Sequence, residues 1–104
     1  MNTLGIIEAG FPTSASEEML DTMSLDEYLV ENKEATYMIK VTGDSMANSG
    51  ILRGDTLIVE RGKTPRPQDI VILETDGSYK MKYVKDLALE CRIEAVVTAV
   101  IRKY

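Results

Sequence analysis

From Ala35 onward the hydrophobic pattern changes to a period of two, and this change restricts the fold more than any other feature of the sequence. Tyr37, Ile39 and Val41 occupy the apolar positions, as in a strand with one buried face. Short apolar runs recur at 55–60, 69–74, 78–84 and 93–102. The pattern predicts a mostly-β domain of five or six short strands.

Turn residues separate the expected strands. Asp76-Gly77 lies between two apolar runs and is typical of a two-residue hairpin turn. Residues 61–68 include one glycine and two prolines, and proline cannot donate a hydrogen bond within a sheet. We therefore expect a hairpin between the third and fourth strands and a longer loop between the second and third.

The first 24 residues show no sustained hydrophobic period and contain several glycine, proline, serine and threonine residues, which favours an extended arm. Ser24 precedes Glu27 by three residues, the pattern of a capping box, and this predicts a short helix or turn over residues 25–32. The expected organisation is an arm over residues 1–34 followed by a β domain over residues 35–104.

The chain has 104 residues, enough for one small domain. Hydrophobic residues make up 44% and charged residues 28%, so the chain is expected to fold. No apolar run approaches the roughly 20 residues of a membrane helix, and Met1 is not followed by a signal-peptide pattern. Cys91, the single cysteine, cannot form an internal disulfide. We expect a cytoplasmic protein without a membrane segment, with Cys91 as a core thiol.

The sequence contains no histidine. This excludes the peptidase triads that use a histidine base, and it removes the commonest ligand of zinc. A lone cysteine with scattered carboxylates is a poor ligand set, so neither a metal nor a cofactor is expected. A hydrolase of this composition must take its general base from a lysine, aspartate, glutamate or tyrosine.

Charge is unevenly distributed along the chain. Residues 1–34 carry eight acidic residues against Lys33 alone, a net charge of −7, whereas residues 35–104 carry nine acidic and eleven basic residues. The first segment is either a solvated arm or one that lies on the remainder of the chain. Because no clustered basic run is visible, direct binding to duplex DNA is not expected.

The strand pattern indicates two kinds of candidate catalytic group, a serine hydroxyl and a lysine amine. Gly43 comes directly after the first expected strand and lets the backbone turn sharply, which can present the Ser45 hydroxyl at a strand end. The same residues are also ordinary in loops. Lys80 and Lys82 lie two residues apart on the fourth expected strand, so they share one face. That face is solvated unless one lysine turns inward.

A serine nucleophile needs a base, and without histidine the candidate is a lysine. To be half neutral near pH 7, a lysine pKa must fall by about 3.4 from its reference of roughly 10.4, or ~4.6 kcal/mol against the ammonium form. Burial against apolar neighbours can supply this. Such a lysine would take the proton of Ser45 Oγ, while the backbone N–H of Ser45 or Met46 stabilises the oxyanion.

A series of short motifs spans about residues 9–84: Ala9-Gly10-Phe11-Pro12, Leu25-Asp26-Glu27-Tyr28-Leu29-Val30, Ala35-Thr36-Tyr37, Gly43-Asp44-Ser45-Met46, Gly50-Ile51, Gly54-Asp55 and Asp69-Ile70-Val71. With these motifs in this order, the chain resembles the LexA/UmuD family of self-cleaving serine peptidase domains. It is most similar to the UmuD-type SOS mutagenesis proteins.

The resemblance implies a scissile bond between Ala9 and Gly10, a Ser45 nucleophile and a lysine base on the strand after the hairpin. The family spacing puts that base at Lys82, with Lys80 the weaker candidate. About 36 residues separate Ala9 from Ser45, and their extended reach of roughly 3.3 Å per residue exceeds the diameter of a small domain. The arm can therefore reach the site of its own chain or of a partner.

The resemblance also implies a small twisted antiparallel sheet of the signal-peptidase-like type, homodimerisation, and stimulation of cleavage by RecA filaments on single-stranded DNA. For the UmuD-type branch it implies that the trimmed form is an accessory subunit of a Y-family translesion DNA polymerase. Two other functions remain open: the C-terminal autocleavage and dimerisation domain of a LexA-like or phage repressor, and a non-catalytic interaction module. The segment between Lys82 and the last strand is short for the family, so a hairpin is expected to be missing or reduced.

Overall fold

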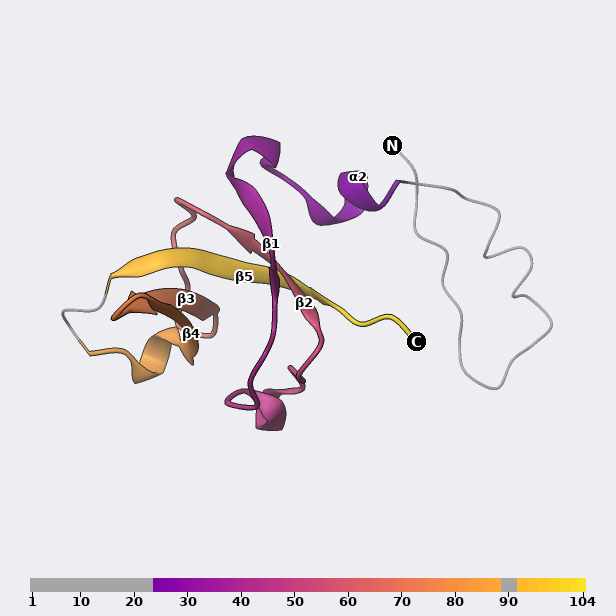
Figure 1. Cartoon of the computed structure of the whole chain (residues 1–104). Coiled ribbons are helices and arrows are strands. Elements are labelled where there is room, and N and C mark those ends of the chain that lie inside the picture. Colours follow the sequence, from indigo (N-terminus) through magenta and orange to yellow (C-terminus); the bar gives the residue numbers. More distant parts are fainter. Residues whose placement is uncertain (1–23, 89–91) are drawn as a thin grey trace. The chain divides into compact units, whose positions relative to one another are not determined.

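The computed structural model describes residues 24–88 and 92–104, and the chain divides into two compact units, Met1–Glu31 and Asn32–Tyr104. In the first unit the described element is the short helix α2, Leu25–Leu29 (Figure 1). The Ser24 side chain accepts a hydrogen bond from the Glu27 N–H at 3.1 Å, so the predicted N-cap is confirmed. The helix is shorter than expected because β-branched Val30 is already extended.

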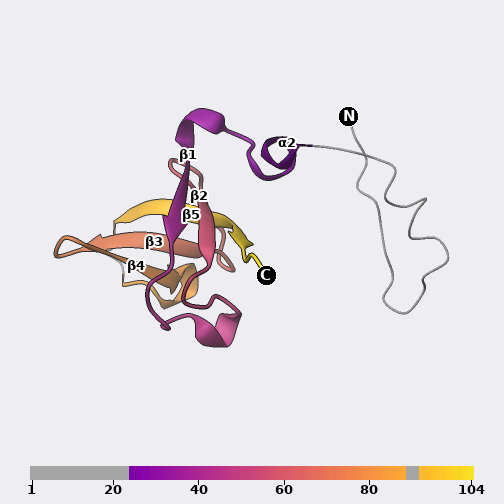
Figure 2. The ribbon, with the colours of Figure 1, turned by 45° about the vertical axis from the view of Figure 1, so that its right-hand side comes forward.

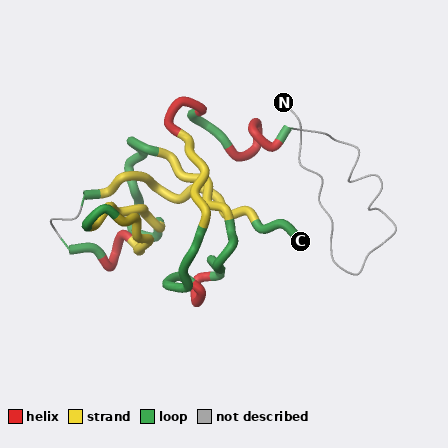
Figure 3. Tube along the Cα trace, in the orientation of Figure 1, coloured by secondary structure: helices red, strands yellow, loops and turns green. Residues whose placement is uncertain are grey.

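The second unit is built on one antiparallel sheet (Figures 1 and 3). Its strands are β1 (Thr36–Lys40), β2 (Thr56–Glu60), β3 (Ile70–Thr75), β4 (Ser78–Tyr83) and β5 (Ile93–Ile101). They lie in the order β1-β2-β5-β3-β4. Three short 3₁₀ helices are described beside them: η1 (Lys33–Ala35), η2 (Ala47–Ser49) and η3 (Val84–Asp86). The predicted mostly-β fold is confirmed.

The turn between β3 and β4 has the geometry that its sequence predicts. Asp76 and Gly77 both have positive φ angles, 51° and 81°, as a type I′ turn requires. Thr75 pairs with Ser78 across this turn, so two residues connect the strands. This turn fixes which residues of β4 lie opposite β3 and therefore where the lysines of β4 are placed.

Two irregularities in β5 increase the twist of the sheet. Thr98 is an extra residue opposite β2, where the register shifts, and its hydroxyl donates a hydrogen bond to Ile58 O at 3.2 Å. Glu94 is the extra residue opposite β3. Such β-bulges bend a strand and add right-handed twist. β1 and β2 accordingly run across the direction of β3 and β4 in both views of the ribbon (Figures 1 and 2).

Apolar side chains pack on both faces of the sheet. On one face Leu57, Val59 and Ile72 are almost fully buried in a cluster with four other buried residues. On the other face Val71 and Val96 are opposite each other and fully buried or nearly so. The alternation of neighbouring residues between faces is the two-residue period that the sequence shows. Nowhere in residues 24–88 and 92–104 is a helix long and apolar enough to cross a membrane.

Candidate active site

Ser45 lies in the connection between β1 and β2, which we call the serine loop (residues 42–54). Backbone hydrogen bonds close the base of this loop: the Val41 N–H donates to Asp55 O at 2.9 Å, and the Gly54 N–H donates to Val41 O at 2.8 Å. The two ends of the loop are therefore held side by side, as in a continuation of the β1–β2 ladder.

Two buried side chains anchor the serine loop in the core. Met46 and Ile51 are 8% and 3% exposed and belong to the cluster on the Leu57 face. The Met46 carbonyl also accepts hydrogen bonds from the N–H groups of Ser49 and Ile51, at 2.9 and 3.2 Å. Ser45, next to Met46, is exposed. The loop thus presents an exposed hydroxyl directly beside a buried anchor, the placement that the glycine-led turn predicts.

A buried carboxylate ties the serine loop to the end of β5. Asp55 is 2% exposed, and its Oδ2 accepts the Leu52 N–H at 2.8 Å. Arg102 donates to both oxygens of Asp55 at 2.8 and 2.7 Å, and to Gly50 O at 2.8 Å. The Arg102 hydrogen bonds, followed by that of the Leu52 N–H, lower the pKa of Asp55 from its usual 3.8 to about 2. The loop is therefore fixed by the ionised Asp55 carboxylate, both of whose oxygens accept hydrogen bonds.

The backbone N–H groups of Ser45 and Met46 are the expected oxyanion donors. Within the described part of the chain, neither of these N–H groups donates a hydrogen bond to another protein atom. η2 begins at Ala47, whose own N–H donates to Asp44 O at 3.1 Å. The two N–H groups that precede η2 are consequently available to a developing negative charge beside Ser45.

Both candidate lysines lie on β4, an edge strand that pairs with β3. Lys80 is opposite Leu73 and Lys82 is opposite Val71, so the two lysines share one face of the sheet, as their spacing predicts. Met81 and Tyr83 pack against the core cluster of the other face. The strand therefore separates two partly buried side chains from two exposed cations.

A cavity of about 670 Å³ brings the serine and the lysines to one place. It is lined by Ile39, Lys40, Val41, Thr42, Gly43, Ser45, Leu57, Ile72, Ser78, Tyr79, Lys80, Met81 and Lys82. β1 and β4 are the two outermost strands of the sheet, and the cavity lies where the end of one approaches the other. The twist of the sheet thus joins groups that are remote in sequence.

Among the described residues, the charged side chains that line this cavity are all of one sign. They are Lys40, Lys80 and Lys82. All three lysines are exposed, because β1 and β4 have no neighbouring strand on their outer sides.

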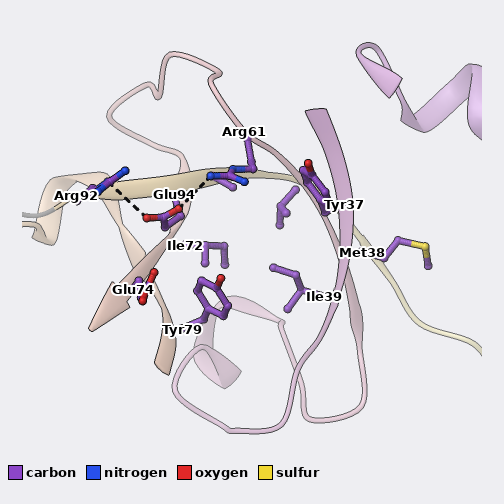
Figure 4. Close-up of a pocket in the computed structure, with 11 residues that line it drawn as sticks. Tyr37, Met38, Ile39, Arg61, Ile72, Glu74, Tyr79, Arg92 and Glu94 are labelled. Atoms are coloured by element: carbon purple, nitrogen blue, oxygen red, sulfur yellow. Dashed lines mark ion pairs between the residues drawn. The ribbon is translucent and has the colours of Figure 1, made fainter. Parts of the chain in front are cut away.

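A second cavity, of about 580 Å³, opens on the same face of the sheet and shares Ile39, Ile72 and Tyr79 with the first (Figure 4). Its polar part is an ion-pair cluster. The Glu94 carboxylate lies 3.5 Å from Arg61 Nη2 and 3.6 Å from Arg92 Nε. Neither Ser45 nor a lysine lines this cavity, so the chemistry expected from the sequence belongs to the first.

Some expectations fall on residues that the structure does not describe. Ala9 and Gly10, the expected scissile pair, and Cys91 lie outside residues 24–88 and 92–104. Within those two ranges, no group of three or more histidine, cysteine, aspartate or glutamate side chains is placed to hold a metal ion. The candidate chemistry thus rests on the hydroxyl, amine and backbone N–H groups around the first cavity.

Sequence reasoning missed the group that fixes the serine loop. Asp55 was recognised only as part of a Gly-Asp motif, and its partner Arg102 is 47 residues away at the end of an apolar strand. The residues next to Arg102 in the sequence do not indicate that its side chain pairs with Asp55. The one available signal was Asp55 itself, an acidic residue directly before the apolar run 56–59.

Comparison with known proteins identifies relatives that match most of the chain. The family model described as Peptidase S24-like matches residues 2–95. Protein ImpA of Salmonella typhimurium is 36% identical over 75 residues, which is 72% of this chain and 52% of that protein. Protein SamA of Salmonella typhimurium is 38% identical over 85 residues, or 82% of this chain and 59% of that protein.

A LexA repressor is also similar. LexA repressor 2 of Geobacter sulfurreducens is 37% identical over 79 residues, covering 76% of this chain and 38% of the repressor. The matched region thus spans a little over half the length of ImpA and SamA and a smaller share of the repressor. These matches confirm the resemblance drawn from the sequence motifs.

Proposed function

The chain belongs to the Peptidase S24-like family, and we propose that it is a self-cleaving serine peptidase that cuts its own Ala9–Gly10 bond. Ser45 is the nucleophile and Lys82 is the general base. The observation that carries the proposal is the cavity that Ser45 and Lys82 line together. Ser45 and Lys82 border one cavity, and a serine hydroxyl and a lysine amine are the two groups that a Ser-Lys mechanism needs.

The chemical steps follow from these groups. The neutral amine of Lys82 takes the proton of Ser45 Oγ as the oxygen bonds to the Ala9 carbonyl carbon. The Ser45 and Met46 N–H groups bind the oxyanion. Lys82 then gives its proton to the Gly10 nitrogen as that bond breaks, which leaves Ala9 esterified to Ser45. Water hydrolyses the ester with Lys82 again as base, and the serine is restored.

The exposure of Lys82 gives the peptide a second role in this mechanism. A peptide segment that fills the cavity removes water from the lysine, and desolvation favours the neutral amine. The base therefore becomes competent when the scissile segment is present, which limits reaction with other substrates.

Mass spectrometry of the purified chain after incubation at pH 7 and pH 10 tests this proposal, with Ser45→Ala and Lys82→Ala as controls. The wild-type chain should yield a product beginning at Gly10. The reaction should be faster at pH 10, because a larger fraction of lysine amines is neutral there. An intact wild-type chain at pH 10, or equal cleavage in Ser45→Ala, would favour a non-catalytic interaction module.

We further propose that the trimmed form is an accessory subunit of a Y-family translesion polymerase in the SOS response, and that cytoplasmic homodimers are cleaved with RecA filaments as co-protease. The similarity to UmuD-type proteins in the motifs of residues 9–84 supports this assignment. Purified RecA on single-stranded DNA should raise the cleavage rate near pH 7. No change in that rate would count against the RecA step.

The alternative function is that of a LexA-like or phage repressor domain. The similarity to LexA repressor 2, at 37% identity over 79 residues, favours it specifically. Genomic context separates the two candidates. A neighbouring polymerase gene supports the first function, and a helix-turn-helix segment encoded upstream in the same reading frame supports the second.

A further inference from the structure

One side-chain hydrogen bond joins the serine loop to the lysine strand. The Tyr83 hydroxyl donates to Ser49 Oγ at 2.5 Å. Ser49 ends η2, four residues after Ser45, and Tyr83 directly follows Lys82 in β4. We call this contact the Tyr83–Ser49 bridge. It connects the loop that carries the proposed nucleophile with the strand that carries the proposed base.

Two contacts fix the ring of Tyr83, so its hydroxyl points toward Ser49. Tyr83 is half-buried and packs against the core cluster that also contains Met46 and Ile51, the two anchors of the serine loop. The Lys85 ammonium lies 5.1 Å from the centroid of the Tyr83 ring, within cation–π range. With the ring fixed in this way, its hydroxyl meets the loop at one place.

The other hydrogen bonds that hold the serine loop connect it to β1, β2 and the end of β5. Val41 and Gly54 join its two ends, and Arg102 ties Asp55 to the end of β5. These contacts hold the loop to β1, β2 and β5, whereas the proposed base is on β4. The core cluster that holds Met46 and Ile51 of the loop also packs against Met81 and Tyr83 of β4, and the Tyr83–Ser49 bridge adds a directed hydrogen bond to this apolar contact.

We propose that Tyr83 and Ser49 are positioning residues that set the distance between Ser45 Oγ and Lys82 Nζ. This inference rests on the proposed Ser-Lys function. An exposed neutral hydrogen bond contributes little to folding, but a displacement of about 1 Å between reacting groups can cost about 100-fold in rate. Loss of the bridge should therefore slow cleavage much more than it affects stability.

The cleavage test compares Tyr83→Phe, Ser49→Ala and the double variant with the wild-type chain between pH 7 and pH 10. Each single variant should lower the high-pH plateau rate about 10-fold. The pH midpoint and the melting temperature should stay the same. The double variant should be no slower than either single variant, because both remove the same contact. Ser49→Thr keeps a hydroxyl and should restore the rate, and Tyr37→Phe is the matched control.

A wild-type rate in Tyr83→Phe, additive losses in the double variant, or a shifted pH midpoint would overturn the inference. A change in midpoint would mean that Tyr83 acts on the titration of the base and not on its distance from Ser45.

A second measurement does not depend on cleavage. Cysteines introduced by Ser45→Cys and Lys82→Cys, in a Cys91→Ser chain, can be joined by a short reagent that alkylates two thiols, which needs no oxidant and replaces part of the length of the lysine stem. The rate of this cross-linking reports the proximity of the two positions. Tyr83→Phe should slow this reaction, and equal rates would overturn the positioning role. Failure of the proposed function is a separate result, an uncleaved wild-type chain at pH 10. The two failures can therefore be distinguished.

Discussion

The two sides of the candidate site are built differently. On the serine side the chain fixes its own geometry: Met46 and Ile51 are buried, and the buried Asp55 carboxylate accepts three hydrogen bonds. On the lysine side Lys80 and Lys82 lie exposed on an edge strand. The comparison indicates that folding preorganises the loop of the proposed nucleophile, whereas we propose that the base becomes competent only when a peptide covers it.

The largest expected effect is on the lysine side. Lys82→Ala should lower the rate of self-cleavage about 10²–10⁴-fold, the usual contribution of a general base. Lys80→Ala is the matched control, because it removes an equally exposed lysine from the same strand and cavity. Quantitative mass spectrometry at pH 10 measures both rates. A greater loss in Lys80→Ala would move the base to that residue.

The next largest effect should be a loss of stability when an anchor on the serine side is removed. Ile51→Ala removes a buried anchor of the serine loop and should cost about 2–5 kcal/mol in the free energy of unfolding. Met81→Ala, on the lysine strand, should cost less because Met81 is only half-buried. Urea denaturation measures both changes. Equal losses would remove the distinction between a fixed serine side and a loosely held lysine side.

A smaller effect should appear at acid pH. The pKa of Asp55 is lowered from 3.8 to about 2, so the folded state binds this proton less readily than the unfolded chain. The stability that Asp55 contributes is therefore present above about pH 4 and is lost as the pH falls toward 2. Melting temperatures between pH 7 and pH 2 should show this loss.

Asp69 adds to the same acid transition, because its pKa is also lowered. The largest cause is the hydrogen bond from the Arg66 backbone N–H, and the Arg66 side chain lowers the pKa further. Asp55→Asn should flatten the acid transition relative to the wild-type chain. Asp76→Asn, in the exposed hairpin turn, is the control and should leave the transition in place. An unchanged acid transition in Asp55→Asn would contradict the role given to the Arg102 pair.

The smallest effect should come from the ion pair on the outside of the serine loop. Asp44 and Arg53 are 2.9 Å apart, and both side chains are about two-thirds exposed. Exposed ion pairs contribute little to stability. Asp44→Asn should therefore leave the melting temperature within about 2 °C of the wild-type value. A large drop would show that the loop depends on its surface charges and not on its buried anchors.

Local patterns were sufficient to predict the strands and their turn. Each of the five expected strand segments overlaps an observed strand, because short alternating or continuous apolar runs between turn residues mark buried strands. Asp76-Gly77 predicted the two-residue hairpin turn, and the structure shows both residues with the positive φ that a type I′ turn requires. A short helix or turn was predicted over residues 25–32, and the helix ends at Leu29, because the apolar face of so short a segment does not mark its C-terminus.

Contacts between distant residues could not be predicted in this way. The Asp55–Arg102 pair and the Tyr83–Ser49 bridge span 47 and 34 residues, and neither partner is marked by its neighbours. The bulges at Glu94 and Thr98 are equally invisible in an apolar strand pattern. The sequence therefore indicated candidate residues for the chemistry, but not how the sheet brings β1 and β4 together around them.

The distance between Ser45 Oγ and Lys82 Nζ, measured in a crystal structure of the chain, tests the central claim most directly. A Ser-Lys pair requires these two atoms to lie within about 2.6–3.2 Å, or to be joined through one water molecule. We expect this separation, with the lysine stem turned over the free edge of β4 into the cavity. An Nζ atom directed into bulk solvent, several ångströms beyond that reach with the cavity occupied by peptide, would contradict the claim.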